Sequence, residues 1–212
     1  MATNDKYEQE LWNSGIKYIA AADESGCGCF AGSVYAAVVI LPPNIDYKVL
    51  LPGINDSKKL SDSTRERLYP LIKQHALAYS VATASVAEID ELNIYWAKFL
   101  AIRRALDGLQ IKPDYVLMDG NKEIPEITIP QLAIVKGDGK SISIAAASIL
   151  AKVERDRYMD KLAEEVHEDY EWKSNRSYYC KATINAFKKH GKTKWHRQKY
   201  VAKFLVEKSD EH

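Results

Sequence analysis

Two apolar, β-forming segments near the start of the chain are separated by a glycine-containing turn. Lys17–Ala22 and Ser33–Leu41 predict strands, and Ser25–Gly32 predicts the turn between them. Helix and strand patterns then alternate as far as a long helix beginning at Ser141, and helices alone follow. This order predicts an α/β fold, with a mixed sheet flanked by helices and a helical C-terminal region.

Capping residues and hydrophobic periodicity place the other elements. Ser61 or Ser63 is expected to begin one helix, and Ser85 with Glu88 forms a capping box that opens another. The further expected strands are residues 76–83, 114–118 and 127–135, and the expected helices are residues 61–75, 85–109, 141–169, 181–190 and 197–208. Acidic residues at the strand ends are of interest, because open α/β sheets place functional side chains there.

Length and composition indicate an ordinary globular protein. The 212 residues predict a single domain, residues 1–212, with a core of about residues 16–170 and a basic helical region of about residues 171–208. No apolar stretch reaches the ~18 residues that span a bilayer, and no signal peptide is visible. The three cysteines form no zinc pattern. We therefore expect a cytoplasmic monomer without a membrane partner.

Charge is unevenly distributed along the chain. Residues 1–170 contain 19 Lys and Arg against 25 Asp and Glu, whereas residues 171–208 contain 11 against 2. The basic segment also carries the aromatic residues Trp172, Tyr178, Tyr179, Trp195 and Tyr200. Such a combination is typical of a surface that contacts phosphates and stacks on bases. A solvated, lysine-rich helical surface explains the composition equally well.

Three segments each present an acidic residue where an apolar element ends. Asp23 and Glu24 follow the first strand, Asp119 follows the strand at residues 114–118, and Asp138 lies in the loop before the long helix. Carboxylates without a His or Cys cluster suit a hard ion, Mg²⁺ or Mn²⁺. Two such ions about 4 Å apart can promote phosphodiester hydrolysis.

Each acid also has an ordinary structural explanation. Asp-Gly is a common turn dipeptide, and adjacent strand residues point to opposite faces, so a turn would have to bring Asp23 and Glu24 to one site. Competing motifs fail: Gly139-Lys140-Ser141 lacks the first glycine of a P-loop, because Ile134 stands there. Position alone leaves a metal nuclease as one hypothesis among several.

Short motifs occur along the chain in a fixed order. Ala22-Asp-Glu-Ser-Gly-Cys-Gly-Cys-Phe-Ala-Gly32 is similar to a signature of Asp-Glu-Ala-Gly-Arg-Gly followed by Ala-Gly. The others are Asn55-Asp-Ser-Lys-Lys-Leu-Ser61, Ile89-Asp90 with Asn93-Ile94, Asp119-Gly120, Lys136-Gly-Asp138, the segment Ile144–Asp156, Asn175-Arg-Ser-Tyr178 and His196-Arg197. In this order they resemble type 2 ribonuclease H, the ribonuclease HII family, over roughly residues 16–204.

The resemblance implies a ribonuclease H-like fold and a metal-dependent endoribonuclease. Such an enzyme would cleave the RNA strand of RNA/DNA hybrids and incise duplex DNA at embedded ribonucleotides. The catalytic, metal-binding residues implied by position are Asp23, Glu24, Asp119 and Asp138, with two Mg²⁺ or Mn²⁺ ions as cofactors. The implied substrate-binding residues are Gly26, Cys27 and Gly28, which would read the 2′-hydroxyl, Lys58 at a phosphate, and Tyr178 on the next sugar. Asp156 is expected behind these residues, in a supporting or helix-packing role.

The chain departs from the family pattern around the expected substrate. Cys27 stands where the family has Arg, Ser177 where it has Gly, Cys180 where it has Thr, and Thr183 where it has His. Losing Arg removes a charge and up to five donors, so a hybrid-binding relative with weakened or altered cleavage is the alternative function. A different polynucleotidyl transferase fits the motif order less well. A Cys27–Cys180 disulfide is a minor further hypothesis.

Overall fold

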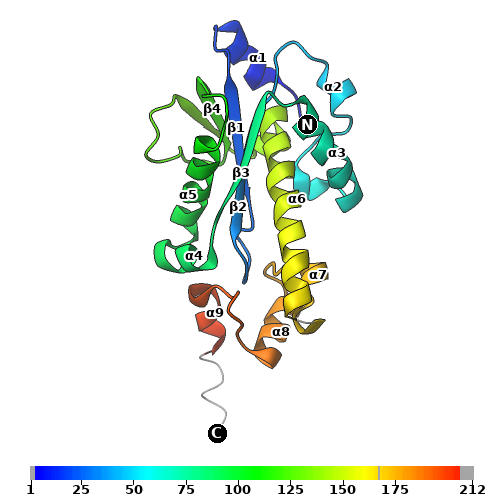
Figure 1. Ribbon diagram of the computed structural model, residues 1–212, viewed down its shortest axis with the longest axis vertical. Helices are drawn as coiled ribbons and strands as arrows, with labels where there is room; N and C mark the ends of the chain where they lie inside the picture. Colours follow the sequence, from blue (N-terminus) through cyan, green and yellow to red (C-terminus); the bar gives the residue numbers. More distant parts are fainter. Residues whose placement is uncertain (1–2, 167, 206–212) are drawn as a thin grey trace.

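A five-stranded mixed sheet forms the centre of the protein (Figure 1). The computed structural model describes residues 3–166 and 168–205. The strand order is β3-β2-β1-β4-β5, in which β1 pairs antiparallel with β2 and parallel with β4. The strands are β1 (Ile19–Ser25), β2 (Val34–Ile40), β3 (Ala78–Ala84), β4 (Tyr115–Asp119) and β5 (Gln131–Ile134). The predicted mixed α/β architecture is confirmed.

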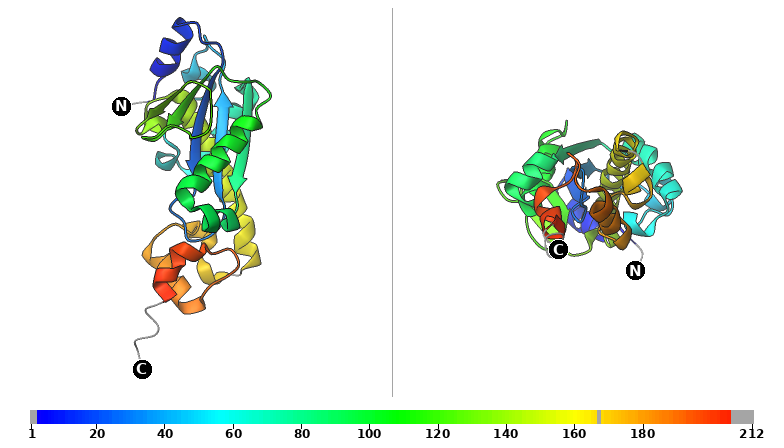
Figure 2. Two further views of the ribbon diagram at one scale, coloured as in Figure 1. Left: turned by 90° about the vertical axis from the view of Figure 1, so that its left-hand side faces the viewer. Right: turned by 90° about the horizontal axis from the view of Figure 1, so that it is seen from below.

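Helices cover both faces of this sheet and extend beyond one end of it (Figures 1 and 2). The α-helices are α1 (Lys6–Asn13), α2 (Tyr47–Leu50), α3 (Asp62–His75), α4 (Val86–Leu92), α5 (Ile94–Asp107), α6 (Ile142–Glu165), α7 (Trp172–Asn175), α8 (Lys181–His190) and α9 (Gln198–Leu205). The 3-10 helices are η1 (Ser57–Lys59), η2 (Gly137–Gly139) and η3 (Glu168–Tyr170).

Alternation along the strands divides the core into two layers. Ile19 and Ala21 of β1 pack with apolar residues of α3 and α6, whereas Ala20 and Ala22 pack with those of α5. Helix α6 is 24 residues long, and most of its first half is buried because it covers the centre of the sheet. The helix expected from Ser141 begins at Ile142, and Ser141 caps it by accepting the backbone N–H of Ile144.

The C-terminal helices lie beyond the sheet and are attached to the turn between β1 and β2 (Figure 2). The Phe30 N–H donates to the Ser177 carbonyl, and the Phe30 carbonyl accepts the N–H of Arg197, both at 2.8 Å. Trp172 is buried in a small apolar cluster separate from the two layers of the sheet, so it is a core residue and does not offer a surface on which bases could stack. Tyr179, by contrast, is 59% exposed. Residues 206–208, the end of the last expected helix, lie outside the described residues.

Several expected element boundaries were wrong for identifiable reasons. The single helix expected at residues 85–109 is divided at Asn93, which has a φ of 68° and caps α5 by accepting the N–H groups of Tyr95 and Trp96. Helix α6 ends at Glu165, short of the expected residue 169. The capping box of Ser85 and Glu88 is confirmed.

Two further observations concern expectations about the chain as a whole. None of the helices in the described part of the chain is long and apolar enough to cross a membrane. All three cysteines carry free thiols, so the disulfide between Cys27 and Cys180 is not formed.

Candidate metal-dependent active site

Three aspartates converge where β1, β4 and η2 meet. Ligand oxygens of Asp23, Asp119 and Asp138 all lie within 4.8 Å of one another. Parallel pairing of β1 with β4 aligns Ala22 with Met118, which places Asp23 beside Asp119. Both point to the face covered by α6, and η2 brings Asp138 to the same place. The sequence predicted all three residues, and the structure brings them together.

Burial makes this group of aspartates costly to keep fully ionised. The pKa of Asp23 is raised well above its usual value by desolvation and by the neighbouring carboxylates of Glu24 and Asp119. Desolvation and the charge of Asp119 also raise the pKa of Asp138, to about 6. Asp23 Oδ2 is buried and has no hydrogen-bond partner within the described residues. A nearby cation would relieve both penalties.

Glu24 lies outside this group of three. Strand β1 continues through Ser25, so Asp23 and Glu24 point to opposite faces of the sheet. The Glu24 carboxylate lies on the α5 side, 3.7 Å from Lys98 Nζ, and it accepts a hydrogen bond from the Cys27 thiol at 3.5 Å. Its Oε2 atom is buried without a partner within the described residues.

Lys58 extends from η1 toward the aspartates. Its ammonium lies 3.8 Å from Asp138 Oδ2, and its side chain is 71% exposed. Desolvation lowers the pKa of Lys58, but the carboxylates of Asp23 and Asp138 outweigh this and raise it. The Asp56 side chain caps η1 by accepting the Lys58 N–H at 2.9 Å. Lys58 therefore stays cationic and accessible beside the aspartates.

The Gly26–Gly28 turn is anchored mainly through its backbone. Gly26 has a φ of +99° and packs so closely on Arg155 that a Cβ atom would lie 2.1 Å from Nε. The Cys27 carbonyl accepts hydrogen bonds from Arg197 Nη1 at 3.2 Å and from the Tyr200 hydroxyl at 3.0 Å. The turn is thus attached to the C-terminal helices at the position that was expected to contact substrate.

Tyr178 lies next to the same turn. Cys29 and Tyr178 form an antiparallel bridge, and the half-buried Tyr178 ring has Arg155 Cζ 5.1 Å and Lys152 Nζ 5.3 Å from its centroid. Ser177 has a φ of 59°, a left-handed conformation that glycine adopts with less strain than serine. The structure therefore places Cys27, Gly28 and Tyr178 in one neighbourhood.

Some residues of the site were not identified from the sequence. Lys98 of α5 pairs with Glu24, and Arg155 is fully buried behind the Gly26–Gly28 turn, as is Arg197, which the sequence motif His196-Arg197 had included. Arg155 Nε and Arg197 Nη2 have no hydrogen-bond partner within the described residues.

Sequence comparison identifies the family of this chain. The family model described as "Ribonuclease HII" matches residues 20–205. The chain belongs to the ribonuclease HII family. Ribonuclease HII of Desulfitobacterium hafniense is 45% identical over 194 residues, covering 92% of this chain and 72% of that protein. Ribonuclease HII of Christiangramia forsetii is 49% identical over 182 residues, covering 86% and 89%.

Solved structures of ribonucleases HII are similar to the whole fold. The ribonuclease H2 of Pyrococcus horikoshii has a TM-score of 0.74 at 25% identity, covering 92% of this chain and 100% of that one. RNase HII in its complex with PCNA from Archaeoglobus fulgidus has a TM-score of 0.71 at 28% identity, covering 87% and 94%. The fold is therefore ribonuclease H-like with an added helical region. Members of the family are metal-dependent nucleases, and this chain is an endoribonuclease of the ribonuclease H type.

Proposed function

We propose that this endoribonuclease hydrolyses the RNA strand of RNA/DNA hybrids and incises duplex DNA at embedded ribonucleotides. The catalytic carboxylates are Asp23, Asp119 and Asp138, with Glu24 as the fourth. The observation that carries the proposal is the convergence of the three aspartates within 4.8 Å of one another. An exposed lysine, Lys58, lies beside them to meet a phosphate.

The residues present fit a hard divalent ion, which we propose to be Mg²⁺ or Mn²⁺. All the donors are carboxylate oxygens, and buried Asp23 Oδ2 and Glu24 Oε2 have no partner within the described residues. When bound, two such ions supply an activated water and stabilise the leaving oxygen of the phosphodiester. Asp23, Asp119 and Asp138 would hold the ions directly, and Glu24 would join them if its side chain turned from Lys98 toward the aspartates.

The protein's own side chains then bind and orient the substrate. Lys58 would neutralise a phosphate next to Asp138, to which its ammonium is already close. The backbone of the Gly26–Gly28 turn would read the 2′-hydroxyl, which distinguishes RNA from DNA. Tyr178 would stack on the next sugar, and Lys152 and Arg155 support its ring. Retention of both glycines supports recognition through the backbone even though Cys27 lacks the charge of Arg.

Three duplexes test the proposal. A DNA duplex with one ribonucleotide, an RNA/DNA hybrid and an all-DNA duplex are each offered with Mg²⁺ and then Mn²⁺. We expect cleavage of the first two and none of the third. Binding by fluorescence anisotropy without any cleavage would instead establish the hybrid-binding alternative.

Substitution of Asp23 tests the site itself. Asp23→Asn should abolish cleavage, a loss of at least about 10³-fold, and leave binding largely intact. The control is Glu126→Gln, an exposed carboxylate that pairs with Arg103. Turnover that survives in Asp23→Asn would refute the assignment.

A further inference from the structure

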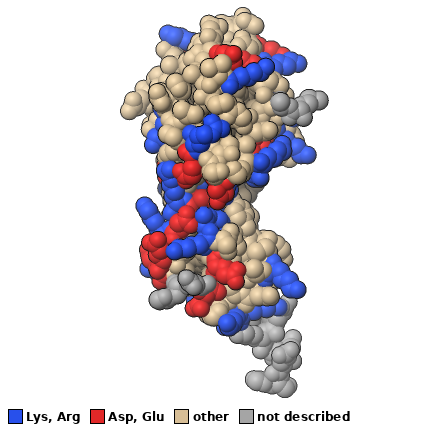
Figure 3. Space-filling view, turned by 90° about the vertical axis from the view of Figure 1, so that its right-hand side faces the viewer, with Lys and Arg blue, Asp and Glu red and all other residues tan. Residues whose placement is uncertain are grey.

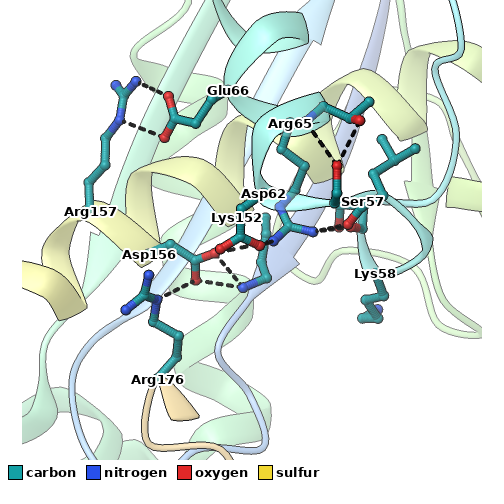
Figure 4. Close-up of polar contacts among 12 residues, drawn as sticks. Ser57, Lys58, Asp62, Arg65, Glu66, Lys152, Asp156, Arg157 and Arg176 are labelled. Carbon is teal, nitrogen blue, oxygen red and sulfur yellow. Dashed lines mark hydrogen bonds and ion pairs between the residues drawn. The ribbon is translucent and has the colours of Figure 1, made fainter. Parts of the chain in front are cut away.

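A cluster of charged side chains joins α3 and α6 to the residue after α7. On the face formed by these helices, positive and negative side chains gather in one band (Figure 3). Within it, the buried Asp156 carboxylate contacts three cations (Figure 4). Lys152 Nζ lies 2.5 and 2.6 Å from its two oxygens, Arg65 Nη2 lies 3.8 Å from Oδ2, and Arg176 Nε lies 3.9 Å from Oδ1.

The first of these cations holds the segment that carries Lys58. Arg65 Nη1 donates to the carbonyl oxygens of Ser57, at 2.7 Å, and Leu60, at 2.5 Å, on either side of Lys58. The Arg65 side chain is 7% exposed, so these contacts are largely shielded from water. The orientation of Arg65 therefore affects where the backbone of η1 lies.

The other two cations, Lys152 and Arg176, lie next to Tyr178 and the turn that carries it. Arg176 precedes Ser177 and Tyr178 directly, and both Arg176 and Ser177 have positive φ values, of 50° and 59°. Lys152 lies over the Tyr178 ring while both of its contacts to Asp156 are formed. A left-handed pair of non-glycine residues persists only when its surroundings hold it in place. Asp156 therefore contacts both Arg176, which begins this turn, and Lys152, which lies over the Tyr178 ring at its end.

We propose that Asp156 is a positioning residue that couples the Lys58 segment to the Tyr178 turn, so that phosphate contact and sugar stacking are set together. This proposal rests on the function proposed above, because it assigns substrate contacts to Lys58 and Tyr178. Without the carboxylate, Lys152 loses both of its contacts to Asp156. Arg65 keeps its ion pair with Asp62, and Arg176 keeps its ion pair with Asp160, but both lose the charge that links them to each other and to Lys152. Arg65 with η1 would then shift independently of Arg176, Lys152 and the Tyr178 turn.

A second ion pair between the same helices provides a matched control. Arg157 of α6 pairs with Glu66 of α3 at 2.6 Å (Figure 4). Both side chains are about half exposed, at 45% and 50%, and the polar contacts drawn for them in Figure 4 run to each other rather than to η1 or the Tyr178 turn. Glu66→Gln therefore removes a helix-to-helix contact without disturbing the coupling.

The test is steady-state cleavage of the single-ribonucleotide duplex. We expect Asp156→Asn to raise KM about tenfold and to change kcat less than about threefold, with Glu66→Gln close to the parent chain. In a Lys58→Ala, Tyr178→Ala background, Asp156→Asn should raise KM no further, because the contacts that it positions are already gone. A merely structural role would add the same penalty in both backgrounds.

The outcomes separate the two proposals. If the parent chain cleaves no ribonucleotide-containing duplex, the proposed function fails. If it does cleave and a folded Asp156→Asn keeps the parent KM, the coupling is overturned. Should Asp156→Asn fail to fold by circular dichroism, Asp156→Glu decides: it keeps the charge but displaces the carboxylate by one methylene, so a KM raised several-fold supports the coupling and an unchanged KM overturns it.

Discussion

Asp119 Oδ1 accepts the backbone N–H of Gly137 at 2.6 Å, and this contact ties the end of β4 to η2, which carries Asp138. A Cβ atom at Gly137 would lie 2.7 Å from Ile144 Cδ1 and 3.4 Å from Asp119 Oδ1. Gly137→Ala should therefore displace η2 and separate the aspartates. We expect kcat to fall at least about tenfold, since an ångström of misplacement costs this much or more, and Mg²⁺ binding by calorimetry to weaken.

Gly139 supplies the control in the same 3-10 helix. The nearest atom to a Cβ there is Lys59 Nζ at 3.5 Å, an ordinary contact with the end of a flexible side chain. Gly139→Ala should keep kcat within about threefold of the parent. Equal losses for the two variants would show that the Asp119–Gly137 contact does not position the site.

Gly26→Ala should destabilise the turn between β1 and β2. The substitution combines a φ of +99° with a Cβ atom 2.1 Å from Nε of the buried Arg155. We expect the free energy of unfolding to fall by about 2–4 kcal/mol, measured by urea denaturation. At Gly28 nothing lies within 4 Å of a Cβ atom, so Gly28→Ala should change the free energy of unfolding by less than about 1 kcal/mol. A similar loss in both would contradict the role assigned to Arg155.

The order of strands and helices was predictable because it depends on local patterns. Apolar, β-forming segments gave β1 and β2, and capping residues gave the starts of α3 and α4. What could not be predicted depends on packing. The division at Asn93 requires a left-handed φ that several residue types adopt. The end of β1 at Ser25, beyond Glu24, depends on pairing with Tyr35 of β2.

The same distinction applies to the site. Asp23, Asp119 and Asp138 end or follow elements whose positions the pattern gives, so their convergence could be anticipated. The placement of Glu24 on the α5 side follows from strand alternation, but its pairing with Lys98 depends on how α5 crosses the sheet. Buried Arg155 could not be anticipated, because a fully buried guanidinium that is hydrogen-bonded only to backbone carbonyls violates the usual rule for charges.

Cys27→Arg should strengthen substrate binding at the ribonucleotide. The Cys27 side chain is partly exposed, and its thiol lies 3.5 Å from Glu24 Oε1, so an arginine there would add a cation and several donors beside the proposed 2′-hydroxyl contact. We expect kcat/KM for the single-ribonucleotide duplex to rise about three- to tenfold relative to the uniform hybrid. Cys27→Ser, which adds no charge, controls for loss of the thiol. An unchanged ratio in Cys27→Arg would favour recognition through the backbone alone.

His196 should make the protein less stable as the pH falls from 6.5 toward 4. Its ring is 1% exposed, and Nδ1 accepts the N–H of Thr193 at 3.0 Å, so the folded protein holds it neutral. Desolvation and the charge of Lys192 lower its pKa from 6.5 to about 4. Between these values the unfolded chain binds a proton that the folded chain does not, so the free energy of unfolding decreases with falling pH.

The size of the His196 effect can be isolated with a variant that does not titrate. Integrated over the window from pH 6.5 to about 4, the single proton corresponds to about 3 kcal/mol. His196→Gln keeps an acceptor within reach of Thr193 but binds no proton. Between pH 7 and pH 4, the free energy of unfolding of the variant should therefore fall by about 3 kcal/mol less than that of the parent protein. The measurement is urea denaturation at half-unit pH steps. Parallel curves for the two proteins would mean that His196 titrates alike in the folded and unfolded chains, and that its burial has no influence on acid stability.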